Sequence, residues 1–240
     1  MTEEYAQLGA YVRDFVPPPR PSGQAMTGRY ARLDKLNAHQ HGAGLHAAFA
    51  CDDRLWDYMP TGPFATPAAY VAWVRSVEDS SDPLFYAITD LETGQLAGVA
   101  SFLRIAPEAG SIEVGYITFS PALQRRRAAT DAMALMMRWA FEAGYRRYEW
   151  KCNALNLASR RAAERLGLSY EGVFRQATIV KGRNRDTAWF AAIDQEWPRL
   201  RAAFDAWLSP ENFDETGRQR VRLSALTQAI RVTDDPALKA

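Results

Sequence analysis

The chain of 240 residues has only two cysteines, Cys51 and Cys152. Two cysteines exclude a disulfide-stapled framework and a zinc site built on cysteines, and they are typical of a protein from a reducing cytoplasm. No apolar run approaches the ~20 residues that a membrane-spanning helix needs. Residues 1–10 hold Glu3 and Glu4 rather than an apolar block, so they do not form a secretory signal. We therefore expect a cytoplasmic protein that does not bind a membrane.

The familiar glycine motifs for binding phosphate are missing as well. No G-x-x-x-x-G-K-[ST] occurs, and no G-x-G-x-x-G follows a predicted strand. An ATP-hydrolysing or NAD-dependent enzyme would therefore lack its motif. The three histidines, His39, His41 and His46, are spaced i, i+2 and i+7, which does not place all three on one helical face. We expect no bound metal.

Charge is nearly balanced over the whole chain, with 29 Lys+Arg against 28 Asp+Glu and a formal net charge of +1. The balance is uneven along the sequence. Residues 120–190 hold 14 basic and 6 acidic residues, a local charge of +8, and the remainder holds 15 and 22, a local charge of −7. The basic segment could bind an anionic ligand, and the acidic remainder could bind a cationic one. An ordinary solvated surface could have the same distribution of charge, so the counts do not decide between these interpretations.

Hydrophobic periodicity and turn residues predict a domain of the α+β class, a mixed sheet covered by helices. The order of elements differs from a doubly wound Rossmann fold. The predicted strands are 26–34, 84–90, 95–105, 111–119, 145–152, 168–174 and 186–193. The predicted helices are 37–50, 66–80, 129–143, 156–166 and 196–208, and a last one lies between 221 and 230. We expect an extended leader over 1–25, one domain over 26–195 and a helical extension over 196–240.

Three consecutive arginines, Arg125, Arg126 and Arg127, precede the clearest predicted helix. Basic side chains at a helix N-terminus are unfavourable for the helix dipole. A bound anion would explain them, because free backbone N–H groups and guanidinium groups would converge on it. The alternative is a solvated turn whose arginines pair with carboxylates.

Two motifs resemble the GNAT (general N-acetyltransferase) superfamily. Residues 124–129 (QRRRAA) resemble its pyrophosphate loop, [Q/R]-x-x-G-x-[G/A]. Residues 156–168 (NLASRRAAERLGL), followed by Glu171 and Gly172, are similar to the N-x-x-S…LGF…EG signature of its RimJ/RimL-like branch. One departure is Arg127, which stands where the family has its first glycine. If the backbone there needs a positive φ, arginine is strained where glycine would not be.

The resemblance implies a three-layer fold with a central, mostly antiparallel sheet flanked by helices, and acetyl-CoA as the acyl donor. The pantetheine arm would lie along the strand 113–119, and the diphosphate would lie on the loop and helix start that follow. The residues that the resemblance assigns to the donor are Gly115, Tyr116, Ile117, Leu123, Gln124, Arg125, Arg126, Arg127, Ala128, Ala129, Asn156 and Ser159.

Acetyl transfer to an amine needs a proton acceptor, a donor for the developing oxyanion and a donor for the leaving thiolate. Glu113 is the candidate base, directly or through water, because strand alternation places it opposite Ile112 and Val114. It could equally be a strand carboxylate paired with an arginine. Ser159 is the candidate donor to the thiolate. Asn156 would contact the pantetheine, although it also suits a helix N-cap.

The resemblance implies an amine as the acceptor, and Trp56, Tyr58 and Glu113 are the candidate residues of its groove. Asp52, Asp53 and Asp57 could attract its ammonium group or be solvated. The basic hairpin tip over 181–186 could touch an anionic part of the acceptor or be ordinary surface. The acceptor could be a peptide N-terminus or a small molecule.

Two other functions stay open at this point. A non-catalytic sensor that binds CoA would share the donor site. A nucleic-acid-binding module would use the basic segment over 120–190, although most of its arginines fall at helix starts and within amphipathic helices, so nucleic acid is not the expected partner. The segment beyond Pro210 could be an interaction arm that supports a homodimer. Cys152 is expected to be a small buried hydrophobe, since no histidine lies near it in the sequence.

Overall fold

The computed structural model describes residues 9–239, so the first part of the expected leader lies outside the described residues. Within 9–239, eight strands form one sheet in the order β1-β2-β3-β4-β5-β6-β8-β7. The strands are β1 Met26–Thr27, β2 Ala31–Lys35, β3 Leu84–Asp90, β4 Gln95–Ala106, β5 Ser111–Phe119, β6 Arg147–Asn153, β7 Ser169–Val180 and β8 Arg183–Ile193. The helices are α1 Ala38–Phe49, α2 Pro67–Val77, α3 Arg127–Glu142, α4 Leu157–Arg165, α5 Trp197–Leu208 and α6 Leu223–Thr227, and a short 3-10 helix, η1, spans Asp53–Trp56.

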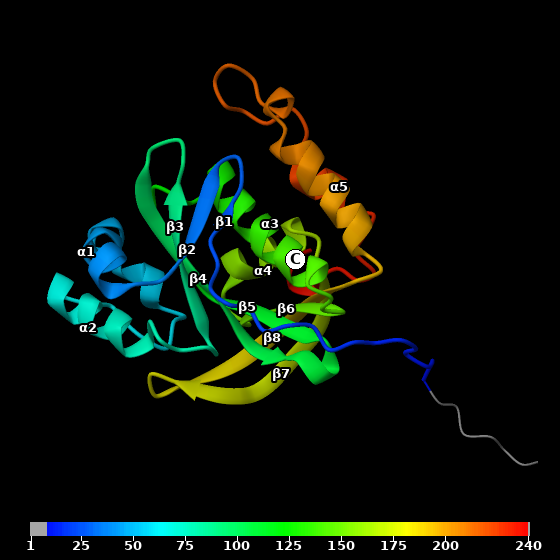
Figure 1. Cartoon of the computed structure of the whole chain (residues 1–240), viewed down its shortest axis with the longest axis horizontal. Coiled ribbons are helices and arrows are strands. Elements are labelled where there is room, and N and C mark those ends of the chain that lie inside the picture. Colours follow the sequence, from blue (N-terminus) through cyan, green and yellow to red (C-terminus); the bar gives the residue numbers. More distant parts are fainter. Residues whose placement is uncertain (1–8, 240) are drawn as a thin grey trace, which may run out of the picture.

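The sheet is mostly antiparallel. Among the described strands, β5 and β6 are parallel neighbours and every other neighbouring pair is antiparallel. Helix α3 connects β5 to β6, and α4 follows β6 directly (Figure 1). Because two adjacent parallel strands end at the same edge of a sheet, the starts of α3 and α4 lie at that edge.

Helices cover both faces of the sheet. Side chains on β3 alternate between two hydrophobic clusters: Tyr86 and Ile88 pack in the cluster that contains α3 and α5, whereas Phe85 and Ala87 pack in the cluster that contains α1 and α2. In Figure 1, α1 and α2 lie together at one side and α3, α4 and α5 lie at the other. The expected three-layer α+β fold is therefore confirmed.

Local signals predicted several elements to the residue. The strands expected over 84–90 and 111–119 are confirmed with both bounds. The side chain of Asn37 caps α1 by accepting from the backbone N–H of Gln40, and Thr66 caps α2 by accepting from Ala69. Asn156 caps α4 by accepting from the backbone N–H of Ser159. These caps depend on neighbours three residues away, which is why the sequence alone reveals them.

Other predictions were wrong in their bounds. The single strand expected over 26–34 is two short strands, because the chain turns at Gly28 and the carboxylate of Asp131 accepts from the backbone N–H groups of Tyr30 (2.6 Å) and Ala31 (3.0 Å). Helix α3 begins at Arg127 rather than at 129. The last hairpin is longer than expected, since β7 and β8 extend to a turn at residues 181–182.

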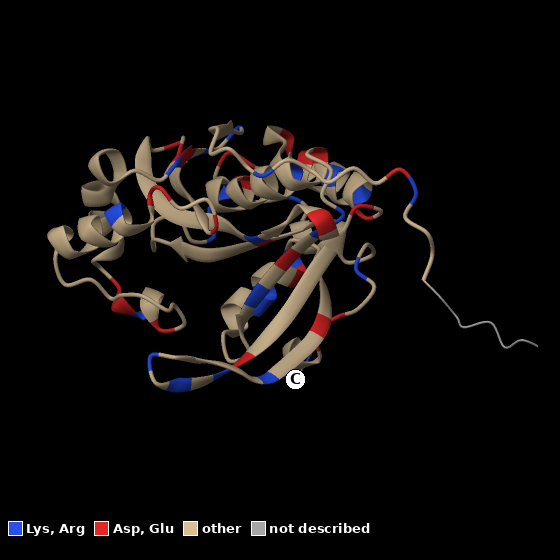
Figure 2. Cartoon of the chain, turned by 60° about the horizontal axis from the view of Figure 1, so that its bottom comes forward, with Lys and Arg blue, Asp and Glu red and all other residues tan. Residues whose placement is uncertain are grey.

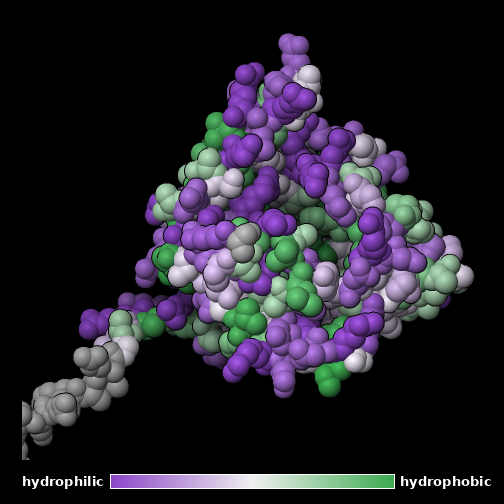
Figure 3. All heavy atoms as spheres, turned by 180° about the vertical axis from the view of Figure 1, so that it is seen from behind, coloured by the Kyte–Doolittle hydropathy of each residue, from purple (hydrophilic) through white to green (hydrophobic). Residues whose placement is uncertain are grey.

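The segment after β8 packs on the α3 side of the sheet. The ring of Trp197 on α5 stacks on that of Phe141 on α3, with centroids 5.3 Å apart. Beyond α5 the chain returns to α4, where Thr227 Oγ1 donates to the carbonyl of Arg165 at 3.1 Å. Viewed from behind, the molecule has a hollow near its middle, with hydrophobic atoms inside and hydrophilic residues around it (Figure 3).

Two further findings concern residues 9–239 only. Their helices are too short or too polar for any of them to cross a bilayer. They also contain no group of three or more His, Cys, Asp or Glu side chains placed to hold a metal ion.

Candidate active site

Strands β5 and β6 separate part-way along their length. They pair over four residues, the last pair being Val114 with Trp150. Beyond that pair, β5 continues to Phe119 beside β4, and β6 continues to Asn153 beside β8. The edges that face each other across the gap carry backbone N–H and C=O groups without a ladder partner. Such edges can pair with an extended ligand that contains amide groups.

A bulge in β5 accompanies the separation. The pairing between β4 and β5 changes register around Tyr116, whose φ is +50°. A bulge bends and twists its strand, and here it lies just past the last pair with β6. A Cβ at the neighbouring Gly115 would lie 2.9 Å from the Cδ2 atom of Leu103, so a larger residue there would displace the end of the Leu103 side chain. The ring of Tyr116 packs on Phe85, with centroids 5.1 Å apart, on the α1/α2 face.

The loop between β5 and α3 offers a basic, uncapped helix start. The side chain of Leu123 is fully buried, whereas Gln124, Arg125 and Arg126 are exposed. No side chain caps α3, so the first N–H groups of the helix have no side-chain partner. The backbone N–H groups of Leu123 and Gln124 both donate to the carbonyl of Ser120, at 2.9 and 3.1 Å, which folds the loop into a tight turn. The site fits a diphosphate, since the free N–H groups, the helix dipole and two exposed guanidinium groups all favour an anion.

The positive φ of this loop lies at Arg125, at +63°, and not at Arg127. Arg127 is the first residue of α3, so the strain that a glycine would relieve there is not present. Its side chain pairs with Glu92 and lies between the rings of Tyr30 and Phe213, 4.6 and 4.7 Å from their centroids. The guanidinium group of Arg127 is therefore held by protein groups, and the backbone N–H is what this residue offers to an anion.

The start of α4 brings together the other predicted donor residues. Ser159 Oγ accepts from the indole Nε1 of Trp150 at 2.9 Å, which leaves its hydroxyl proton to be donated to a nearby acceptor. Cys152 lies nearby, 6% exposed, and burial raises the pKa of its thiol while a hydrogen bond with Ser159 opposes that shift. A neutral, buried thiol agrees with the expected packing role of Cys152.

Glu113 occupies the centre of a chain of ion pairs on the face of the sheet opposite α3. Its carboxylate lies 2.7 Å from Arg104 Nη1 and 2.8 Å from Lys151 Nζ, and the Glu113 side chain is only 3% exposed. Lys151 also lies 2.7 Å from Glu149, which in turn pairs with Arg147 at 2.6 Å. Glu113 and Glu149 face each other directly in the register of β5 and β6.

These two carboxyls differ in their pKa. Burial raises the pKa of Glu113, and the hydrogen bonds and charges of Lys151 and Arg104 offset that rise only in part. Burial also acts to raise the pKa of Glu149, but the hydrogen bonds and charges of Arg147 and Lys151 outweigh it, so the pKa of Glu149 is lowered. Neighbouring carboxyls whose pKa values are pushed apart are typical of acid–base sites.

The backbone conformation at Arg104 orients its side chain for the ion pair with Glu113. Arg104 has φ of +47°, at a second shift of register between β4 and β5. The carboxylate of Asp82 accepts from the backbone N–H groups of Arg104 at 2.8 Å and Ile105 at 3.0 Å. The bulge therefore turns the arginine side chain toward Glu113.

Comparison with known proteins identifies this arrangement. Residues 32–169 match the family described as the acetyltransferase (GNAT) domain, which is more than half of the chain. The chain belongs to the GNAT acetyltransferase family. The separated strands, the loop before α3 and the start of α4 all lie within the matched residues. As a GNAT enzyme the protein is an acetyl-CoA-dependent acetyltransferase, which confirms the expected family, activity and donor.

Individual relatives agree with this assignment. A GCN5-related N-acetyltransferase from Brucella melitensis is 45% identical, with a TM-score of 0.88 over 90% of this chain and 100% of that one. The uncharacterised N-acetyltransferase YnaD of Bacillus subtilis is 24% identical over 151 residues, 62% of this chain and 86% of YnaD. The microcin C7 self-immunity acetyltransferase MccE, solved in complex with acetyl-CoA and AMP, is 19% identical with a TM-score of 0.62, over 69% of this chain and 93% of MccE, and shares the fold.

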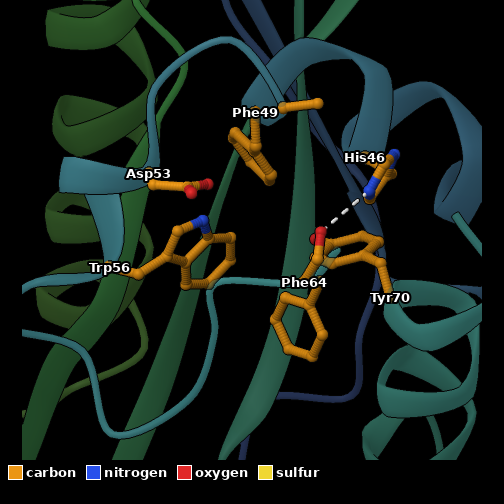
Figure 4. Close-up of a pocket in the computed structure, with 7 residues that line it drawn as sticks. His46, Phe49, Asp53, Trp56, Phe64 and Tyr70 are labelled. Carbon is orange, nitrogen blue, oxygen red and sulfur yellow. Dashed lines mark hydrogen bonds between the residues drawn. The ribbon is translucent and has the colours of Figure 1, made fainter. Parts of the chain in front are cut away.

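In this GNAT enzyme the ring of Trp56 lies inside an aromatic cluster. It is 4% exposed and packs edge-on against Phe49 and Phe64, with centroids 5.7 and 5.1 Å away. Figure 4 shows these rings with His46, Asp53 and Tyr70 around a cavity of about 10 Å³, room for at most a single water molecule. The buried indole of Trp56 therefore packs the η1 segment against the aromatic cluster.

Two contacts connect the η1 segment to the opposite side of the gap. Lys181 Nζ, at the tip of the β7–β8 hairpin, donates to the carbonyl of Trp56 at 2.8 Å. The hydroxyl of Tyr58 donates to the carbonyl of Leu155, between β6 and α4, at 3.3 Å. In Figure 2 the hairpin reaches below the sheet, and its basic tip lies beside the η1 segment. These contacts bridge the face of the sheet that carries Glu113, and we call the bridged part of this face the groove.

Sequence reasoning missed the partners of Glu113. Arg104 lies in a predicted strand, but nothing in the sequence indicated that it contacts Glu113. Its orientation depends on the bulge and on the hydrogen bonds of Asp82. Lys151 and Glu149 could have been found, since Arg147, Glu149 and Lys151 alternate along β6 and must share one face. Arg185 and Trp189 share a face of β8 in the same way, and Lys151 Nζ lies 3.7 Å from the Trp189 ring centroid.

Proposed function

We propose that this GNAT enzyme transfers the acetyl group from acetyl-CoA directly to a primary amine while both substrates are bound. The observation that carries the proposal is the gap between β5 and β6, with the uncapped start of α3 at its open end. The facing strand edges would pair with the amides of the pantetheine arm along Gly115, Tyr116 and Ile117. The acceptor would enter from the opposite face, where Glu113 lies.

The diphosphate would bind at the start of α3. The backbone N–H groups of Arg127, Ala128 and Ala129 would donate to it, and Arg125 and Arg126 would supply charge. Leu123 and Gln124 would shape the turn, since their own N–H groups are already bonded to Ser120.

The proposed chemistry uses residues on both sides of the gap. Glu113 would accept the proton of the amine, directly or through water, and its raised pKa makes the carboxylate a stronger base than an ordinary glutamate. Ser159 would turn its hydroxyl proton from Cys152 toward the leaving thiolate, and Asn156 would hold the pantetheine while capping α4. No acyl-enzyme on Cys152 is needed, because a neutral buried thiol is a weak nucleophile.

The signature over residues 156–172 also supports the RimJ/RimL-like branch. Its members act on protein N-termini and on small amines, so the branch leaves both as acceptors. A homodimer held by the segment beyond Pro210 is not needed for this proposal.

Replacing both Arg125 and Arg126 by alanine tests the donor site. Each charge-assisted hydrogen bond contributes about 1.5–3 kcal/mol, so we expect the Kd for acetyl-CoA to rise at least tenfold. The measurement is isothermal titration, with the variant of Arg75, an exposed arginine on α2, to alanine as a control. Wild-type protein that does not bind acetyl-CoA, or a double variant that binds as tightly as the Arg75→Ala control, would contradict this site.

A further inference from the structure

Arg185 lies on β8 at the level where β6 ends. The last pair between these strands is Asn153 with Thr187, two residues from Arg185. Because side chains alternate along a strand, Arg185 shares its face with Thr187 and Trp189, the face that also carries Lys151 and Glu113. This is the face over which the η1 segment and the hairpin tip close.

Arg185 has no protein partner in the part of the chain that the structure describes. Its Nε atom is buried and makes no hydrogen bond, and no described carboxylate lies within ion-pair distance. The other charged side chains on this face are engaged. Glu113 pairs with Arg104 and Lys151, and Arg147 pairs with Glu149 and with Glu171 at 2.5 Å. Asp186, its neighbour in sequence, accepts from Asn184 and from the backbone N–H of Gln176.

An arginine stays protonated at neutral pH, so Arg185 carries a positive charge that no described carboxylate pairs with. Burial lowers the pKa of the guanidinium, and the negative charge of Glu113 acts against that shift. The indole Nε1 of Trp189, on the same face, is a second buried donor without an acceptor.

Unpaired buried donors destabilise a protein unless a ligand satisfies them. A ligand that pairs with a guanidinium group is a carboxylate or a phosphate, because these oxyanions accept two parallel hydrogen bonds from it. A simple cationic amine would be repelled by the same charge. The groove is also bridged by the Lys181–Trp56 and Tyr58–Leu155 contacts, which favours a small acceptor over the N-terminus of a folded protein.

We propose that Arg185 binds an oxyanion on the acceptor, so that the substrate is a small amine that also carries a carboxylate or a phosphate. This inference rests on the proposed function. It names the class of amine that the groove accepts, and it makes Arg185 a specificity-determining residue. The amine would face Glu113 while the oxyanion lies on β8.

The test compares matched amines by isothermal titration into protein saturated with CoA. Serine against serinamide is the carboxylate arm, and O-phosphoethanolamine against ethanolamine is the phosphate arm. We expect the anionic member of at least one pair to bind at least tenfold more tightly than its neutral partner. Release of CoA from acetyl-CoA, followed with a thiol reagent, should show the same preference in kcat/KM.

Three variants assign that preference to a residue. Arg185→Gln should abolish it, and Arg185→Lys should retain part of it, since lysine keeps the charge without the two parallel donors. Arg175→Gln, which changes an exposed arginine on β7 of the same hairpin, should bind as the wild type does. The Kd for acetyl-CoA should be unchanged in all three.

Equal binding of both members of every pair, no binding by any anionic amine, or an unchanged preference in Arg185→Gln would overturn the inference. Failure of the proposed function looks different, because the wild type would then not bind acetyl-CoA. Binding of acetyl-CoA without any preference for anionic amines would refute the role of Arg185 alone.

Discussion

Replacement of Glu113 by glutamine is expected to lower kcat about 100- to 10,000-fold, the range that a general base contributes. Glutamine has nearly the same shape and keeps an acceptor for Arg104 and Lys151, but it cannot take up a proton at neutral pH. The KM for acetyl-CoA should change little, because the carboxyl lies on the acceptor face. The measurement is CoA release across a range of pH. The wild-type kcat should increase as the pH passes the raised pKa of Glu113, because the carboxyl then loses its proton. The variant should not show this increase.

The neighbouring Glu149 provides the matched control. It contacts the same Lys151, at 2.7 Å against 2.8 Å for Glu113, and faces Glu113 in the register of the two strands. Glu149→Gln therefore removes a comparable partner from Lys151 without removing the proposed base. If both variants lose the same amount of activity, or if Glu113→Gln loses less than tenfold, Glu113 stabilises the ion-pair chain and does not accept the proton.

Glu113 also predicts a pH dependence of stability. Because folding raises its pKa above the ordinary value of 4.5, the folded state binds this proton more tightly than the unfolded chain does. The stability that it contributes is full below pH 4.5 and is lost as the pH rises toward the raised value. Urea unfolding of the wild type and of Glu113→Gln should show the difference in this window, with the variant less dependent on pH. A variant with the same pH dependence as the wild type would contradict the raised pKa.

The sequence predicted the local parts of this site because local chemistry determines them. The β-branched and aromatic residues of Ser111–Phe119, with Pro121 shortly after them, predicted β5 with both bounds. The position of Asn156 three residues before Ser159 predicted the cap of α4, which the structure confirms. The arginines before α3 led to the proposed anion site, because basic side chains are unfavourable at a helix N-terminus, although Arg127 proves to pair with Glu92.

Contacts between residues far apart in the sequence were not predictable in the same way. The strain expected at Arg127 is at Arg125 instead, because Glu92 and the rings of Tyr30 and Phe213 hold Arg127 at the start of the helix. The pairing of Arg104 with Glu113 depends on a bulge fixed by Asp82. No periodicity encodes such partners, since they meet only when separate elements pack together.

The C-terminal segment illustrates this limit most clearly, because it holds a helix of the active site in place. Asp235 is fully buried, and both its oxygens accept from Arg160 on α4, each at 2.6 Å. Arg160 also donates to the carbonyl of Ala154 at 2.7 Å, in the turn just before Asn156. The last residues of the chain are thereby connected to the helix that carries Ser159.

Replacing Asp235 by alanine is therefore expected to lower the free energy of unfolding by about 3–5 kcal/mol, because it leaves the Arg160 charge buried without a partner. Guanidinium unfolding measures the loss. Asp205 on α5 is the control: it is 51% exposed and pairs with Arg201, which is 53% exposed, so Asp205→Ala should cost about 0–1 kcal/mol. A loss for Asp235→Ala within 1 kcal/mol of that control would refute a structural role for the buried pair.

A double variant separates the unpaired charge from the loss of packing. Arg160→Met combined with Asp235→Leu removes both charges and fills similar volume, and replacing a buried pair in this way is often neutral or stabilising. It should therefore recover most of the stability lost in Asp235→Ala. It also removes the hydrogen bond to Ala154, so the turn before Asn156 loses its support. We accordingly expect the double variant to be stable and yet to have a raised KM for acetyl-CoA, a combination that a purely stabilising role for Arg160 does not give.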